Sequence, residues 1–173
     1  MRIENDGSVE RVADLAPFGT HPWNDIVVDG RGNAYINNLG FRYPAEEYSP
    51  GSIVMVGGDG SIKHVADGLA FPNGMAVTPD NTTLIVAESY GKRLAAFDIE
   101  ADGSLSNRRT WADVEGHPDG ICLDASGAVW YADVPNQRCV ASWRVERCWM
   151  SLNSTKGASP ACSVGKTGGT FSC

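Results

Sequence analysis

The chain has 173 residues, 42% of them hydrophobic, which is enough material for a packed core. Its formal net charge of −7 disfavours nucleic acid and anionic membrane surfaces as partners, because both would repel it. No apolar run approaches the roughly 20 residues that cross a bilayer, and the first six residues are too polar for a secretory signal, so we expect a cytoplasmic protein.

Three segments of the chain repeat one pattern, at residues 21–29, 71–80 and 117–124. Each segment begins with a proline-containing turn, continues with a lone Asn or Asp, and then enters a short apolar strand. A polar turn and a second apolar strand follow each time, as expected of a chain with 20 glycines and 9 prolines. The spacing of about 45–50 residues is typical of a repeat protein.

Asp-Gly-Ser turns mark the other half of each unit. They begin at Asp6, Asp59 and Asp102, each between short strands. Asp-Gly supplies the positive φ angles that a tight hairpin turn needs. One period therefore contains about four short strands, the content of a propeller blade of ~40–50 residues. The sequence predicts an all-β fold, a partial β-propeller of about three blades, over residues 1–139.

The number of blades is too small for a closed ring, because propellers close with roughly 4–8 blades. An unclosed stack would expose strand edges and blade faces, which is an aggregation hazard. The segment Arg2–Glu4 leads into the first Asp-Gly turn as a strand that should already have partners. We therefore expect that earlier blades are missing from this chain.

The pattern stops near Val140. Glu146 is the only acidic residue of 140–173, although the whole chain has 21. We interpret this segment as an aberrant tail, either disordered or the product of a frameshift, because a neighbouring frame from the codon of Trp149 onward can encode an alternating strand. The five cysteines all follow residue 121 without Cys-x-x-Cys spacing, so we expect neither a disulfide framework nor a structural zinc site.

The repeat places Asn24, Asn73 and Asp119 at one equivalent position, just before the strand expected to line the propeller axis. Equivalent positions of successive blades converge on the central channel. Three side-chain oxygens around one axis suit a hard cation such as Ca²⁺ or Mg²⁺, and Zn²⁺ or Mn²⁺ could also bind there. Such a cation would polarise a carbonyl and activate a water, from which Asp119, the only carboxylate of the three, would accept a proton.

A purely structural interpretation of these residues stays open. Asn-Gly and Asp-Gly pairs such as Asn73-Gly74 and Asp119-Gly120 are ordinary turn formers. A turn, however, does not require the same register three times. The recurrence therefore favours a functional cluster without excluding the structural role.

The three motifs together resemble the senescence marker protein / gluconolactonase / luciferin-regenerating enzyme family. They read Asn-Asp-Ile-Val-Val-Asp at 24–29, Phe-Pro-Asn-Gly-Met-Ala at 71–76 and His-Pro-Asp-Gly-Ile-Cys-Leu-Asp at 117–124. The resemblance covers roughly residues 1–139. It implies a six-bladed propeller with one divalent cation in the central channel, and hydrolysis of sugar or aldonic lactones.

The resemblance also implies roles for individual residues. Asn73 and Asp119 match metal ligands, with Asp119 also the proposed base, and Asn24 matches a residue that borders the metal and the substrate. The chain departs from the family pattern twice. The metal-binding glutamate of the family's first blade has no counterpart, and Pro22 stands where an arginine often contacts substrate.

We therefore expect metal-dependent hydrolysis of a small-molecule lactone, with one divalent cation as cofactor and Ca²⁺ favoured over Zn²⁺, Mg²⁺ and Mn²⁺. A propeller used only for binding and an inactive fragment of a lactonase are the alternatives. Residues 37–50 are numerous enough to form a loop over the channel mouth. Four aromatic side chains either wall the pocket entrance or pack in the core: Trp23, Phe41, Tyr43 and Tyr48.

Overall fold

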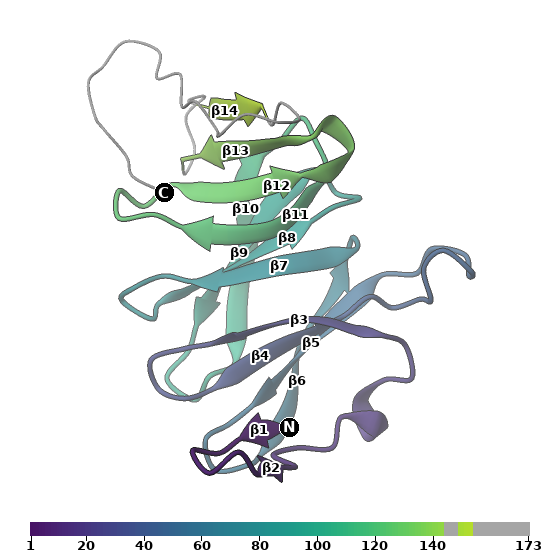
Figure 1. Ribbon diagram of the computed structural model, residues 1–173, viewed down its shortest axis with the longest axis vertical. Coiled ribbons are helices and arrows are strands. Elements are labelled where there is room, and N and C mark those ends of the chain that lie inside the picture. The colour runs from purple at the N-terminus through teal and green to yellow at the C-terminus, as the bar shows by residue number, and fades with distance from the viewer. Residues whose placement is uncertain (144–148, 154–173) are drawn as a thin grey trace.

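The computed structural model describes residues 1–143 and 149–153, and strands dominate it (Figure 1). Three four-stranded antiparallel sheets follow one another along the chain, each with its strands paired in sequence order. The first sheet contains β3 (Trp23–Val28), β4 (Ala34–Asn38), β5 (Gly51–Val56) and β6 (Ile62–Leu69). The second contains β7 (Pro72–Val77), β8 (Thr83–Glu88), β9 (Arg93–Ile99) and β10 (Leu105–Asp113). The third contains β11 (Pro118–Leu123), β12 (Val129–Asp133), β13 (Arg138–Ser142) and β14 (Trp149–Asn153).

The three sheets are successive blades of a β-propeller. The first strand of each blade packs against the first strand of the next, β3 against β7 and β7 against β11, as Figure 1 shows. These inner strands line the side of the stack that faces the propeller axis. The prediction of an all-β propeller fold with about three blades is confirmed.

A two-stranded hairpin precedes the first blade, formed by β1 (Arg2–Ile3) and β2 (Val9–Glu10). Its turn is closed by a 2.9 Å bond from the Ser8 backbone N–H to Asp6 Oδ1. The turn between β5 and β6 and the turn between β9 and β10 contain the same bond, at Asp59 and at Asp102. The predicted Asp-Gly-Ser hairpins are therefore present, and β1–β2 has the local structure of the two outer strands of a blade.

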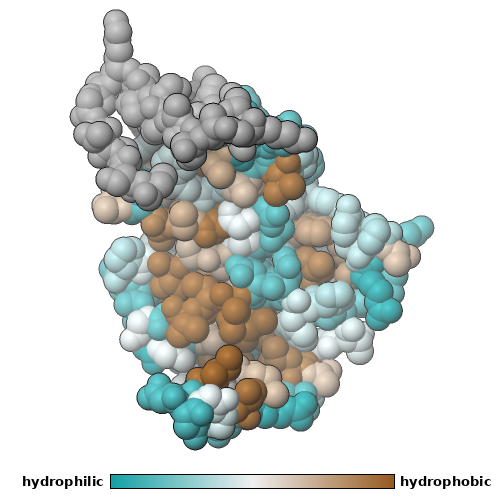
Figure 2. All heavy atoms as spheres, in the orientation of Figure 1, coloured by the Kyte–Doolittle hydropathy of each residue, from teal (hydrophilic) through white to brown (hydrophobic). Residues whose placement is uncertain are grey.

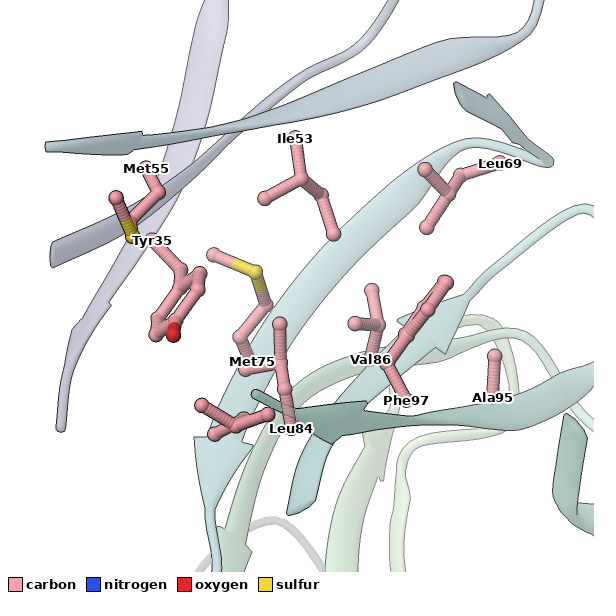
Figure 3. Packing of buried hydrophobic residues seen from close by; sticks show 10 residues of the cluster. Tyr35, Ile53, Met55, Leu69, Met75, Leu84, Val86, Ala95 and Phe97 are labelled. Atoms are coloured by element: carbon pink, nitrogen blue, oxygen red, sulfur yellow. The ribbon is translucent and has the colours of Figure 1, made fainter. Parts of the chain in front are cut away.

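Apolar side chains fill the space between neighbouring blades. Figure 3 shows Tyr35, Ile53 and Met55 of the first blade next to Met75 of the second. Burial of side chains of this size contributes roughly 1.5–3 kcal/mol each. A second cluster joins the second and third blades and contains Ile85, Ala87, Leu94, Ala96, Trp111 and Val129.

The middle blade is covered on both faces, and its sequence reflects this. All six residues of β8 are buried, and four of them, Leu84–Ala87, form a continuous apolar run. In β3 the residues alternate between half-buried and exposed, because no blade among the described residues covers its second face. Ile26 and Val28 on that face are 59% and 57% exposed. Figure 2 shows hydrophobic atoms gathered over the first blade and at the β1–β2 hairpin.

The predicted change of pattern at residue 140 falls inside β13, which pairs with β12, and β14 continues the same sheet. Residues 144–148 and 154–173 lie outside the described residues, so the aberrant tail and its frameshift origin stay predictions. Two short 3₁₀ helices, η1 (Ala16–Phe18) and η2 (Val134–Asn136), complete the described structure. No helix of these described parts is long and apolar enough to cross a membrane.

Candidate functional site

Asn24, Asn73 and Asp119 occupy the same place in three successive blades. Each is the second residue of an inner strand: β3, β7 or β11. A β-bulge interrupts the pairing of each inner strand with its neighbour at this point, and bulges redirect side chains. The interruptions fall between Trp23 and Ile26, between Pro72 and Met75, and between Pro118 and Ile121.

The structure brings two of these residues into direct contact. The Asn24 amide Nδ2 donates to Asn73 Oδ1 at 3.2 Å and to the Pro72 carbonyl at 3.2 Å. Asn73 Nδ2 in turn lies 3.4 Å from the Ser89 hydroxyl. The amide nitrogen of Asn73 is thereby held by its own blade, and its oxygen is turned towards the first blade.

Asp119 lies on the next inner strand, which approaches β7 closely. A Cβ added to Gly74 would lie 2.5 Å from the Ile121 amide nitrogen and 2.7 Å from the Asp119 carbonyl oxygen, so only glycine fits there. The Ser89 hydroxyl, which contacts Asn73, donates to the Pro118 carbonyl at 2.6 Å. Within the part of the chain that the structure describes, the Asp119 carboxylate bonds to no protein group. Among these described residues, no group competes with a ligand for it.

Buried polar groups fix the first two blades to each other beneath this cluster. Asn37 is fully buried, and its Nδ2 donates to the Asn73 carbonyl at 2.6 Å. Asn37 Oδ1 accepts from the Asp25 amide at 3.1 Å, and the Asp25 carboxylate accepts from the Met75 amide at 2.8 Å. Because each bond crosses between strands, the positions of Asn24 and Asn73 are tightly coupled.

The last residue of the second strand in each blade is also polar and buried, which the sequence analysis missed. Glu88 is 0% exposed, accepts from the Ala70 amide at 2.8 Å and pairs with Arg93 at 3.0 Å and Arg108 at 2.8 Å. Burial alone would raise the pKa of Glu88, but the hydrogen bonds from Arg93, Ala70 and Arg108 outweigh it and lower that pKa. The carboxylate thereby holds the turn that leads into β7.

The third blade repeats this arrangement. Asp133 accepts from the His117 amide at 3.3 Å and from Arg138 Nε at 2.9 Å. In the first blade Asn38 takes the same position and donates to the His21 carbonyl at 2.8 Å. The sequence contains a pattern that predicts these two ion pairs. An acidic residue is followed five positions later by arginine, in Glu88–Arg93 and Asp133–Arg138. These groups position the site-bearing strands rather than line the site.

The donor set suits part of a cation site. Among residues 1–143 and 149–153, no three His, Cys, Asp or Glu side chains come together in a way that could hold a metal ion. Within this described part, the cluster offers amide oxygens and the carboxylate of Asp119. Oxygen donors of this kind are those that Ca²⁺ and Mg²⁺ prefer, but these cations usually take six or more ligands. The cluster fits a hard cation as part of a larger donor set.

The four aromatic residues considered for the pocket entrance divide into two groups. Trp23 packs against the apolar cluster of Ile36, Val54 and Val56 on the outer face of the first blade. The other three gather in the loop between β4 and β5 and around the start of β7: Phe41, Tyr43 and Tyr48. Core packing was thus the correct alternative for Trp23.

Comparison with known proteins identifies relatives of the chain. Residues 1–148 match the family model for the SMP-30/Gluconolactonase/LRE-like region. The diisopropyl-fluorophosphatase of Loligo vulgaris is 30% identical over 162 residues, which cover 82% of this chain and 47% of the relative.

Two solved structures resemble the fold of this chain. A luciferin-regenerating enzyme superposes with a TM-score of 0.69 at 23% identity, over 84% of this chain and 51% of its own. A gluconolactonase from Xanthomonas campestris superposes with a TM-score of 0.57 at 31% identity, over 69% of this chain and 42% of its own. The chain thus spans about half the length of these proteins. Since the family model matches most of its residues, the chain belongs to the SMP-30/gluconolactonase/LRE-like family.

Proposed function

We propose that this chain carries part of the active site of a metal-dependent lactone hydrolase. The observation that supports the proposal is the placement of Asn24, Asn73 and Asp119 at one bulge position on three adjoining inner strands. A turn-forming role alone does not require that three blades present oxygen donors at the same register. Membership of a family that includes gluconolactonases supports a lactone as the substrate class.

In this proposal Asn73 and Asp119 hold one divalent cation, for which Ca²⁺ is the first candidate. A bound cation would polarise the ester carbonyl and lower the pKa of a water next to it. Asp119 accepts the proton from the attacking water, because its carboxylate is not committed to a described protein group. Asn24 borders the substrate, and its bond to Asn73 fixes the direction in which the Asn73 oxygen points.

Hydrolysis of glucono-1,5-lactone by the 173-residue chain tests this proposal, with proton release followed in weak buffer. Because the chain carries only part of the donor set, we expect slow turnover with Ca²⁺, Zn²⁺, Mg²⁺ or Mn²⁺ and its loss with a chelator. Asp119→Asn should lower the rate by about 10²-fold or more, since it removes the base and a charged ligand. Diisopropyl fluorophosphate is a second assay substrate, because the squid relative is named for it.

The matched control is Asp67→Asn, because the Asp67 side chain is 79% exposed and lies away from the inner strands. It should leave the rate unchanged. Hydrolysis that persists in the chelator, or equal rates for the Asp119 and Asp67 variants, would contradict the proposal.

A further inference from the structure

Five aromatic rings form one continuous cluster that the proposed chemistry does not use. We call it the aromatic shelf; it consists of Phe41, Tyr43, Tyr48, Phe71 and Tyr90. Phe41 is 3% exposed and contacts the other four rings. The three tyrosines remain 57%, 48% and 45% exposed in chain order. The shelf therefore has a buried anchor and an open, ring-lined surface.

The shelf adjoins the polar cluster. Phe71 precedes β7 by one residue and Asn73 by two, and Tyr90 directly follows Ser89, whose hydroxyl contacts Asn73. The Ser89 amide donates to the Phe71 carbonyl at 3.1 Å, and the Tyr90 amide donates to the Ala70 carbonyl at 3.1 Å. These bonds fix Phe71 and Tyr90 relative to Asn73.

One residue of the shelf has a strained backbone. Phe71 has a φ of +59°, a left-handed conformation that a bulky residue rarely adopts. Backbone strain of this kind persists where the surrounding structure imposes it, and it is frequent at ligand-binding positions. The ring centroids of Phe71 and Tyr90 are 4.7 Å apart. The strained residue therefore places its own ring in the shelf.

The loop that carries Tyr43 and Tyr48 is tied down at its base. The Leu39 amide donates to the Pro22 carbonyl at 3.2 Å, and the Arg42 amide donates to Glu46 Oε2 at 2.8 Å. Glu46 also lies 3.5 Å from His21 Nε2. Figure 1 shows this loop, between β4 and β5, projecting beyond the ends of the strands.

The chemistry of the shelf selects a neutral aromatic ligand. Aromatic rings pack edge to face or offset on one another, and such pairs favour a further ring over an aliphatic chain. Within the described residues, the hydroxyls of Tyr43, Tyr48 and Tyr90 have no hydrogen-bond partner. The loop also carries two exposed carboxylates, Glu46 and Glu47, against one exposed cation, Arg42, and this excess of negative charge disfavours an anionic ligand.

We propose that the aromatic shelf binds the ring of a lactone that carries an aryl group, and so sets the substrate class of the adjoining site. This inference rests on the proposed function for the position of the ester, although the binding of the ring does not. A neutral aryl lactone would place its ring against Tyr48 and Tyr90 and its carbonyl towards Asn73 and Asp119.

Binding is tested with two lactams, which resemble lactones but resist hydrolysis: 3,4-dihydro-2-quinolinone, with a fused aryl ring, and 2-piperidone, without one. Isothermal titration should give at least about tenfold tighter binding of the aryl lactam. Tyr90→Ala should remove most of that preference, and Tyr90→Phe should retain it, because the ring and not the hydroxyl carries the packing. Val134→Ser, an exposed apolar residue of the third blade, is the control.

Hydrolysis of dihydrocoumarin and δ-valerolactone separates the two proposals. Preferred binding of the aryl lactam that depends on the Tyr90 ring supports the shelf even if neither lactone is hydrolysed, in which case the proposed function fails alone. Metal-dependent hydrolysis of both lactones at equal efficiency, with no difference between the lactams, overturns the shelf and leaves the proposed function intact. Unchanged preference in Tyr90→Ala also overturns it.

Discussion

The side-chain amide of Asn24 donates to the side-chain oxygen of Asn73 at 3.2 Å, across the boundary between two propeller blades. The two residues are 49 positions apart in the chain but occupy one repeat position. Adjacent inner strands thus convert a sequence repeat into a spatial cluster.

Replacement of Asn73 should weaken cation binding. We expect Asn73→Ala to reduce Ca²⁺ affinity by at least about tenfold, because even partners that only orient metal ligands are worth 10–100-fold. Calorimetric titration of the purified chain measures this. Asn5→Ala, in the exposed turn of the β1–β2 hairpin, should bind Ca²⁺ as the unaltered chain does. Equal affinities of the two variants would remove Asn73 from the site.

Gly74→Ala should destabilise the chain by about 1–3 kcal/mol, the usual cost of forcing an extra group into a packed region. The added Cβ would lie 2.5 Å from the backbone of β11 and would separate β7 from β11. Gly120→Ala is the matched control, since no atom lies within 4 Å of its added Cβ. Its effect should stay within about 0.5 kcal/mol. Urea unfolding followed by circular dichroism distinguishes the two.

Glu88→Gln should cost about 3 kcal/mol, because it leaves two arginines beside a buried group that no longer carries a charge. Glu115→Gln, at a side chain that is 77% exposed, should change the free energy of unfolding by less than about 0.5 kcal/mol. Thermal unfolding of both variants provides the comparison. Similar losses in the two would show that burial of Glu88 has no energetic consequence.

The same residue predicts the direction of the pH dependence. The pKa of Glu88 is lower in the folded chain than its ordinary value of 4.5. Its stabilising contribution is therefore complete above about pH 4.5 and is lost as the pH falls through the folded pKa. We expect the unaltered chain to lose more stability than Glu88→Gln between pH 6 and pH 3. Parallel losses would assign the acid sensitivity to other groups.

Ile26 and Val28 should promote self-association of the isolated chain, because they form an exposed apolar face on the inner strand of the first blade. We expect the double variant Ile26→Ser, Val28→Ser to scatter less light at equal concentration. Its stability should change little, as both side chains are more than half exposed. Val134→Ser alters a single exposed residue of η2 and should leave scattering unchanged.

The sequence predicts the strand repeat, because short local motifs recur at a regular interval. The same recurrence predicts that Asn24, Asn73 and Asp119 are equivalent. The contacts across blades could not be predicted in this way. The bond from Asn37 to the Asn73 backbone and the approach of Gly74 to β11 depend on how far neighbouring blades tilt, which no local pattern encodes. The shelf partner Tyr90 was missed because it follows a strand end without any motif.

The repeated bulge affects how such a site can change in evolution. Because the same bulge occurs at each of the three positions, one codon per blade determines which donor is offered there. The donor at this repeat position can therefore differ from blade to blade. Of the three described positions, two carry asparagine and one carries aspartate.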